Sequence, residues 1–207
     1  MESKQPLLSG IFYHIYNRGN GGGDIFFEEK NYAYFLHLWD KHVEPIAETF
    51  AYCLMKNHFH VLIRIREEVV IHERMIAKNS KLNLTYFCSQ QLSNFFNSYA
   101  KGVNKAYHLT GSLFESRFER KTIKNKRYLL NLITYIHQNP QKHGFADDFR
   151  FYPHSSYQSH LSEKQSKLMR ATVHQLFGSK EDFLKQQESK PFKNSEFEEL
   201  VVEKIVG

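Results

Sequence analysis

The chain has 207 residues, which is enough for one domain with extensions and for a real hydrophobic core. A formal net charge of +6 and a pI of about 9.1 favour an anionic partner such as nucleic acid, although many basic proteins bind no DNA. The apolar fraction of 41%, the absence of any apolar run near the ~20 residues of a membrane span and the lack of a secretory signal at Met1–Leu8 predict a soluble, cytoplasmic protein.

The first third of the chain predicts one strand, one helix and a hairpin of two strands. Ile11–Arg18 has strand composition and ends in a glycine-rich turn, and apolar residues then recur at helical spacing over Tyr32–Val43. Thr49–Met55 has the composition of a buried strand, and Lys56-Asn57 is a short turn into His58–Arg66. Alternation places Phe59, Val61, Ile63 and Ile65 on one face of this last strand, and His58, His60, Leu62, Arg64 and Arg66 on the other.

The middle of the chain predicts an insertion, a long helix, an extended segment and a second helix. Glu67–Leu82 is charged and breaks the preceding pattern, so we interpret it as a connecting insertion with some helix. An apolar stripe from Leu84 to Val103 predicts a long amphipathic helix. Gly111–Ile123 is predicted to be extended, and Lys126–Asn139 to be a helix that Pro140 terminates.

Beyond Gly144 the pattern weakens into short helical segments, at Ser155–Leu161, Val173–Phe177 and Asp182–Gln187. Lys190–Gly207 is predicted to be a peripheral helix or a frayed tail. The order of strands and helices predicts an α+β domain of the split βαβ type, with helices covering one face of a sheet. We divide the chain into a domain at 10–157 and a helical, peripheral extension at 158–207.

The sequence His58-Phe59-His60 has the most direct chemical meaning. Residues at i and i+2 of a strand point to the same side, so both imidazoles leave one face while Phe59 anchors the other. Two neutral imidazoles side by side are a partial ligand set for a divalent metal ion. The alternative is that both are ordinary histidines on a polar strand face, since the chain has 12 histidines.

A second group of residues shares one face of the helix predicted at Lys126–Asn139. Tyr135 and Asn139 are one turn apart, and Tyr128 lies two turns before Tyr135, roughly 10 Å away along the helix. A tyrosine beside an apolar stripe is usually a packing residue with a hydrated hydroxyl group. Together with the histidine pair, however, the amide oxygen of Asn139 could complete a three-ligand metal set one turn from a tyrosine hydroxyl.

Basic residues gather between the predicted late strand and the tyrosine helix, where they could follow a phosphate backbone. Aromatic residues interleave with them and could stack on bases. The expected DNA-binding residues are Arg18, Lys56, Arg117, Arg120, Lys121, Lys124, Lys126 and Arg127. For any single one of them, the alternative is a solvated surface cation whose aliphatic stem covers the core.

Four motifs occur in the chain in a characteristic order. They are Tyr13–Gly19 (YHIYNRG), Tyr52–Ile63 (YCLMKNHFHVLI), Gly111–Phe118 (GSLFESRF), and Tyr135–Pro140 (YIHQNP) followed by Lys142-His143-Gly144. With them the chain resembles single-tyrosine transposases of the HUH endonuclease superfamily, and more specifically the REP-associated tyrosine transposases. The NHFHVLI segment is the most specific part of this resemblance, which runs from about Gly10 to about Tyr157.

This resemblance implies a ferredoxin-like antiparallel sheet with the histidine pair on a central strand. It also implies that Tyr135 is the nucleophile and that His58, His60 and Asn139 hold Mg²⁺ or Mn²⁺. Asn139 stands where insertion-sequence relatives have Gln, so a shorter side chain must approach the metal more closely. Members of the family cleave single-stranded DNA near a hairpin, form a 5′-phosphotyrosine and reverse the step without ATP. The implied partner is single-stranded DNA with REP-like hairpins, and both a monomer and a homodimer are compatible with the resemblance.

Two other functions remain open from the sequence. One is a domesticated DNA-hairpin-binding protein that keeps the fold and the basic surface without efficient cleavage. The other is a replication-initiator or relaxase nickase, which shares the histidine pair and the chemistry. The complete set of His58, His60, Tyr135 and Asn139 argues against the first alternative, because a binding protein needs none of these groups. The early strand, the Lys56-Asn57 turn and the spacing from Tyr135 to Asn139 favour the transposase over the nickase.

Overall fold

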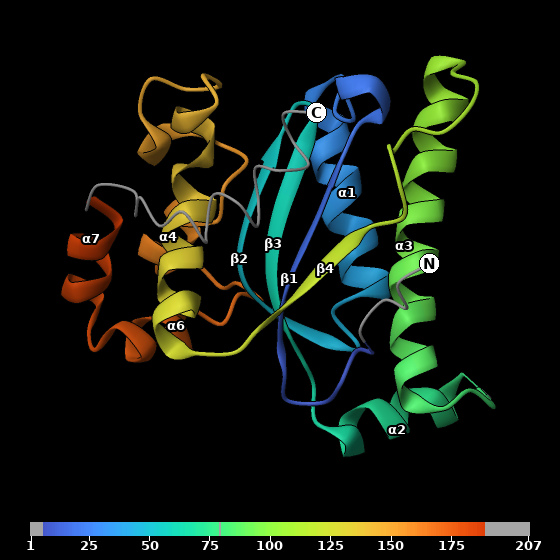
Figure 1. The fold of residues 1–207 in the computed structure, drawn as a ribbon, viewed down its shortest axis with the longest axis horizontal. Helices are drawn as coiled ribbons and strands as arrows, with labels where there is room; N and C mark the ends of the chain where they lie inside the picture. Colours follow the sequence, from blue (N-terminus) through green and yellow to red (C-terminus); the bar gives the residue numbers. More distant parts are fainter. Residues whose placement is uncertain (1–5, 79, 189–207) are drawn as a thin grey trace.

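A four-stranded antiparallel sheet organises the chain, in the order β2-β3-β1-β4 (Figure 1). The structure is a computed structural model that describes residues 6–78 and 80–188. The strands are β1 (Phe12–Arg18), β2 (Ala47–Met55), β3 (His58–Ile65) and β4 (Glu119–Ile123). A two-residue turn joins β2 to β3, so that Met55 pairs with His58 in the hairpin.

The helices connect and cover these strands. They are α1 (Glu29–His42), α2 (Glu68–Ala77), α3 (Leu84–Tyr107), α4 (Lys126–Lys142), α5 (Tyr157–Leu161), α6 (Arg170–Phe177) and α7 (Lys180–Glu188), with 3-10 turns η1 (Asn20–Gly22) and η2 (Phe149–Phe151). The order β1-α1-β2-β3-α3-β4 is a split βαβ arrangement, since β3 pairs with both β1 and β2. The predicted α+β class with an antiparallel sheet is confirmed.

One face of the sheet is covered by α1 and α3 (Figure 1). The alternation predicted along β3 is confirmed, because Phe59, Val61, Ile63 and Ile65 all enter this core. The ring of Phe59 lies between the two helices, with centroids 5.1 Å from Phe35 of α1 and 5.8 Å from Phe96 of α3. The helices approach closely at Gly102, where a Cβ atom would come within 2.6 Å of the Tyr34 hydroxyl oxygen.

The second face is covered as well, by α4 with α6 and α7 beyond it (Figure 1). Here the structure differs from the sequence prediction, which placed helices on one face. The reason is that β2 and β3 carry apolar side chains on both faces, and Cys53 and Leu62 become fully buried against Leu132 and Ile136 of α4. α6 and α7 add Val173 and Phe183 to the same core. The residues predicted as a tail, 190–207, lie outside the described part of the chain.

α4 continues through Pro140 to Lys142, so the prediction that Pro140 ends the helix is wrong. A proline inside a helix removes one hydrogen bond to the carbonyl four residues earlier. Pro140 lies in the last turn, so only two helical residues follow it. The backbone N–H of His143 still donates to the carbonyl of Asn139 at 3.0 Å. Of the extended segment predicted at 111–123, only β4 forms a strand.

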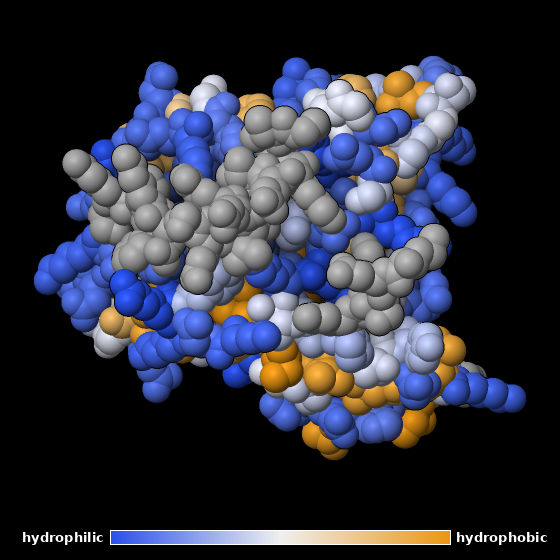
Figure 2. All heavy atoms as spheres, viewed as in Figure 1, coloured by the Kyte–Doolittle hydropathy of each residue, from blue (hydrophilic) through white to orange (hydrophobic). Residues whose placement is uncertain are grey.

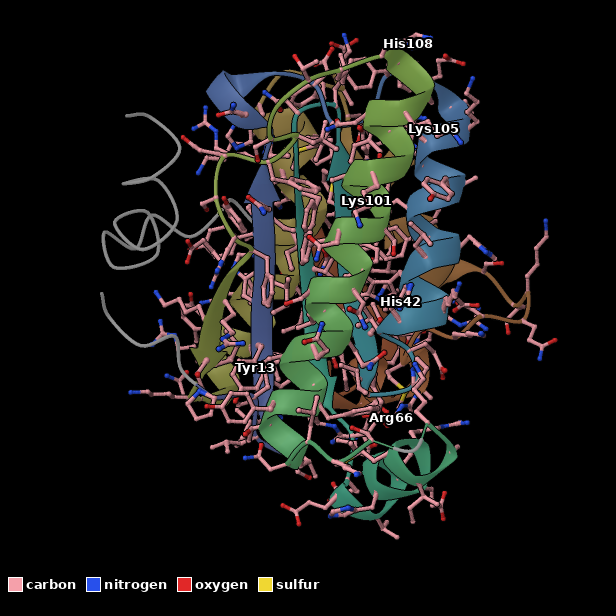
Figure 3. The ribbon with its side chains drawn as sticks, turned by 90° about the vertical axis from the view of Figure 1, so that its right-hand side faces the viewer. Tyr13, His42, Arg66, Lys101, Lys105 and His108 are labelled. Carbon is pink, nitrogen blue, oxygen red and sulfur yellow. The ribbon has the colours of Figure 1, made fainter. Side chains whose placement is uncertain are left out.

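Exposed apolar side chains lie on α2 and exposed basic side chains on α3, both away from α4. Val69 and Ile76 of α2 are 65% and 76% exposed, and apolar side chains gather at this end of the molecule (Figure 2). Figure 3 shows Lys101, Lys105 and His108 along α3, which covers the opposite face of the sheet from α4. Among the described residues, no helix is long and apolar enough to cross a membrane.

Candidate active site

β3 brings His58 and His60 to the face of the sheet that α4 covers. Their side chains are buried, with 6% and 1% of their surface exposed, and their ring centroids are 5.4 Å apart. Phe59 between them enters the opposite core, as strand geometry requires. The rings of Phe35, Phe96 and Phe114 contact Phe59 in that core and fix the orientation of the strand that carries both imidazoles.

Tyr135 and Asn139 of α4 and His143, which caps its C-terminus, are four positions apart and so share one side of the helix. The ring of Tyr135 lies edge-on to His60, with centroids 5.6 Å apart, and the ring of His143 lies 5.0 Å from that of His58. Asn139 is fully buried midway between Tyr135 and His143. Helical spacing places it on the side of α4 that carries the ring contacts to His60 and His58.

Three polar atoms of this cluster are buried without a hydrogen-bond partner in the described chain: Nε2 of His58, Nε2 of His60 and Oδ1 of Asn139. Leaving such an atom unpaired costs ~1–3 kcal/mol, so three together require an explanation. Two imidazole nitrogens and an amide oxygen are ligands that suit a divalent cation such as Mn²⁺, and less well Mg²⁺. The residues present therefore fit the metal that the family resemblance implies.

This candidate ligand set is electrically neutral. Within residues 6–78 and 80–188, no three His, Cys, Asp or Glu side chains are arranged to hold a metal ion. A cation held by the histidine pair would need a third ligand of another kind, such as the amide oxygen of Asn139, and a set without a carboxylate would leave the full charge of the cation available to a phosphate group.

Burial keeps the two histidines in the neutral form that binds metals. Burial, with His143 and Arg18 nearby, lowers the pKa of His58 to about 3. Burial, together with the neighbouring histidines, lowers the pKa of His60 well below its ordinary value. At neutral pH each imidazole thus carries one proton and one lone pair.

Tyr135 and Tyr128 have different surroundings on α4. Tyr135 contacts His60 and lines a cavity of about 620 Å³, and the Nζ atom of Lys142 lies 5.4 Å from the centre of its ring. Tyr128 lies nearer the start of the helix, beside Lys121 of β4 at 5.8 Å. Burial raises the pKa of Tyr128 to about 12. Tyr135, rather than Tyr128, therefore borders the histidine pair.

Two predicted DNA-binding cations of β4 lie on opposite faces of the sheet. Lys121 lies on the α4 face, beside the ring of Tyr128. Arg120, the preceding residue, points the other way, donates to Ser89 of α3 at 3.3 Å and lies over the ring of Phe118. Arg120 is thus not brought together with the histidines.

Arg18 and Lys56 lie at the ends of the strands near the site, each beside a carboxylate. Arg18 pairs in register with His58 and is 3.3 Å from Glu115, and Lys56 is 2.9 Å from Asp24. The remaining predicted cations are exposed, one in the loop before β4 and three around the start of α4: Arg117, Lys124, Lys126 and Arg127.

Three residues that contact His58 or His60 were not assigned to the site from the sequence: His14, Asn57 and His143. His14 of β1 contacts His60, and Asn57 of the hairpin turn contacts His58. Alternation along 11–18 does place His14 on the same side as Arg18. Only the sheet order, with β1 next to β3, brings that side to the histidine pair.

Similarity to known proteins concerns the fold and the family resemblance. No known protein-family profile matches the chain. A curated protein of Haemophilus influenzae named "Putative REP-associated tyrosine transposase" is 26% identical over 113 residues, which are 53% of this chain and 58% of that protein. A solved structure of a REP-associated tyrosine transposase bound to a REP hairpin matches with a TM-score of 0.56 at 15% identity, over 79% of this chain and 86% of that one. The fold is shared, and the resemblance to REP-associated tyrosine transposases is confirmed.

Proposed function

We propose that this chain is a metal-dependent single-stranded DNA endonuclease and strand transferase of the transposase type, acting at hairpin-flanked sites. One observation carries the proposal: the ring of Tyr135 on α4 lies against that of His60, and Nε2 of His58, Nε2 of His60 and Oδ1 of Asn139 are buried without a hydrogen-bond partner in the described chain. The similarity to a named REP-associated tyrosine transposase, and a fold shared with one bound to a REP hairpin, support hairpin DNA as the partner.

Tyr135 is the nucleophile in this mechanism. Its phenolic oxygen attacks the phosphorus of a phosphodiester and forms a new P–O bond, while the bond between phosphorus and the 3′ oxygen breaks. The phenol loses its proton, and the departing 3′ oxygen gains one to become a free hydroxyl group. Attack of a 3′ hydroxyl on the resulting 5′-phosphotyrosine reverses the step, and no ATP is needed because the number of phosphoester bonds does not change.

His58, His60 and Asn139 would hold Mg²⁺ or Mn²⁺ beside this tyrosine. A tyrosine hydroxyl of ordinary pKa ~10 is a weak nucleophile at neutral pH and needs assistance. When bound, the cation polarises a phosphoryl oxygen and orients the scissile group. The protein contributes the rigid, neutral and buried ligand set, and Arg18 and Lys121 add positive charge for neighbouring phosphates.

The test uses a pool of single-stranded oligonucleotides, each with one hairpin and randomised flanks, incubated with Mn²⁺ or Mg²⁺. A label at the 3′ end should become covalently attached to the protein, because the 3′ fragment carries the 5′ phosphate. A label at the 5′ end should appear in a shortened strand with a free 3′ hydroxyl. Tyr135→Phe should abolish the adduct, whereas the matched variant Tyr128→Phe should retain it.

Three results would contradict the proposal in different ways. An adduct in Tyr135→Phe that disappears in Tyr128→Phe would overturn the choice of nucleophile. Cleavage without metal that also persists in His58→Ala would overturn the role of the cation. Tight hairpin binding with no adduct at any metal concentration would favour a DNA-hairpin-binding protein without efficient cleavage.

A further inference from the structure

Each histidine of the pair has a partner on its other ring nitrogen. The Oδ1 atom of Asn57 is 2.7 Å from Nδ1 of His58, and Nε2 of His14 is 3.0 Å from Nδ1 of His60. We propose that Asn57 and His14 are positioning residues, which hold His58 and His60 in the Nδ1–H tautomer and leave both Nε2 lone pairs for the divalent cation. This inference rests on the proposed function, because it concerns the same metal site.

The tautomer of His58 follows from the chemistry of the amide. The Nδ2 atom of Asn57 donates to the carbonyl of Gly22 at 3.4 Å, which orients Oδ1 toward His58. An amide oxygen only accepts hydrogen bonds, so Nδ1 of His58 must carry the proton. A neutral imidazole has one ring proton, so Nε2 of His58 then carries a lone pair, and this atom is buried.

The hydrogen bond between Nε2 of His14 and Nδ1 of His60 contains one proton, which either ring can donate. Two arrangements are therefore possible. In the first, His60 donates from Nδ1 to Nε2 of His14, and Nε2 of His60 is a lone pair. In the second, His14 donates from Nε2, and the proton of His60 lies on the nitrogen that a cation needs. Only the first arrangement is compatible with metal binding, so His14 must act as the acceptor when a cation is bound.

The surroundings of His14 suit this role. It is fully buried, and its ring stacks on that of His60 with centroids 5.0 Å apart. It reaches His60 from the neighbouring strand, since all of β1 pairs with β3. A rigid partner of this kind orients the ligand ring and raises its basicity, and losing one typically weakens metal binding 10–100-fold.

The tautomers can be observed directly by long-range ¹H–¹⁵N NMR of the histidine rings in the wild-type chain. With saturating Mg²⁺, which is diamagnetic, we expect protons on Nδ1 of His58, His60 and His14. A proton on Nε2 of either His58 or His60 in the metal-bound protein overturns the inference. This measurement needs no variant and no cleavage assay.

Mn²⁺ affinity, measured by calorimetry in the absence of DNA, tests the two partners separately. His14→Phe keeps the shape of the ring but offers no acceptor, and Asn57→Ala removes the amide, so each should weaken binding by ~10-fold or more. His14→Gln places an amide oxygen at the reach of Nε2, and Asn57→Asp retains an acceptor, so both should restore most of the affinity. Tyr16→Phe, which keeps its ring contacts to His14 and His60, is the matched control and should bind as the wild type does.

The outcomes separate this inference from the proposed function. A wild-type chain that binds Mn²⁺, with equal affinity in His14→Phe and Asn57→Ala, overturns the inference alone. A wild-type chain that binds neither Mn²⁺ nor Mg²⁺ overturns both the inference and the metal role in the proposed function. If His14→Phe fails to fold, as judged by circular dichroism, the comparison of His14→Gln with wild type and the tautomer measurement still decide.

Discussion

Asn139 donates a hydrogen bond from its side-chain nitrogen to the backbone carbonyl of Tyr135, one turn earlier in α4, at 2.9 Å. This bond occupies the nitrogen of the amide within the helix. The nitrogen is held, and the oxygen remains without a partner in the described chain. The proposed metal ligand and the proposed nucleophile are thus tied to each other through one turn of α4.

Replacing Asn139 should separate the ligand role from the structural role. Asn139→Leu removes both the oxygen and the donor, and we expect Mn²⁺ affinity to fall at least about tenfold. Asn139→Asp keeps a ligand oxygen, adds a negative charge and loses the donor to Tyr135, so metal affinity should rise while stability falls by about 1 kcal/mol. Calorimetry and urea unfolding measure the two effects, and Mn²⁺ binding by Asn139→Leu at wild-type strength would exclude Asn139 as a ligand.

The neutral ligand set predicts a preference among cations and a dependence on DNA. Mn²⁺ should bind more tightly than Mg²⁺, because imidazole nitrogen is a poorer ligand for the harder ion. Bound hairpin DNA should strengthen metal binding, since its phosphate contributes the charge that His58, His60 and Asn139 lack. Titration of Tyr135→Phe with and without a hairpin oligonucleotide measures this, and linkage requires that the metal strengthen DNA binding by the same factor. Equal metal affinity with and without the hairpin would show that no DNA phosphate contributes to binding of the cation.

Two adjacent cations of β4 offer a matched test of which face of the sheet binds DNA. Lys121→Gln should weaken hairpin binding and lower the slope of log Kd against log salt concentration by about 1, because one phosphate contact is lost. Arg120→Gln should change neither quantity, since Arg120 bonds to Ser89 and covers Phe118 on the far side. Fluorescence anisotropy at several salt concentrations gives both values. The reverse result would place the DNA on the α3 face.

The ring of Phe59 holds the histidine strand in the core. Phe59→Ala should lower the free energy of unfolding by about 3–5 kcal/mol, because the side chain is fully buried among aromatic rings. Phe59→Leu fills more of the space and should cost less. Urea denaturation measures these differences, with Val69→Ala on the exposed side of α2 as a control that should stay within about 0.5 kcal/mol of wild type. A loss below 1 kcal/mol in Phe59→Ala would show that Phe59 does not anchor this core.

His160, which is buried beside Phe183 on the α4 side of the sheet, should make stability depend on pH. Burial, with His137 and His174 nearby, lowers the pKa of His160 to about 2, while its ordinary value is 6.5. Below pH 6.5 His160 binds a proton in the unfolded chain but not in the folded chain. The contribution of neutral His160 to the free energy of unfolding is therefore complete above that pH. It is lost progressively as the pH falls, by about 1.4 kcal/mol per pH unit.

Urea unfolding between pH 5.5 and 4.5 tests this contribution. His160→Leu should reduce the slope of the unfolding free energy against pH by about 1.4 kcal/mol per unit, whatever its effect on stability at pH 7. Phe183→Leu, which packs against His160, should lower stability without removing this pH dependence. An unchanged slope in His160→Leu would mean that His160 is protonated in the folded protein.

Several parts of the fold and of the site follow from local patterns. Alternation along 58–66 places the two histidines on one face and Phe59 on the other, and helical spacing places Tyr135 one turn before Asn139. The end of α4 could not be read in the same way. A proline usually ends a helix, yet Pro140 lies in the last turn, where only one backbone hydrogen bond is lost.

The sequence by itself determined which chemical groups share a strand face or a helix face, because the periods of 2 and 3.6 residues are properties of the backbone. Only the tertiary structure decided which of these faces meet. α4 lies on the second face of the sheet because apolar residues of β2 and β3 on that face must be buried, and this brings Tyr135 to His60. The order of the sheet brings His14 to His60 across 46 positions of sequence, a pairing that depends on distant strands packing together and that no local pattern contains.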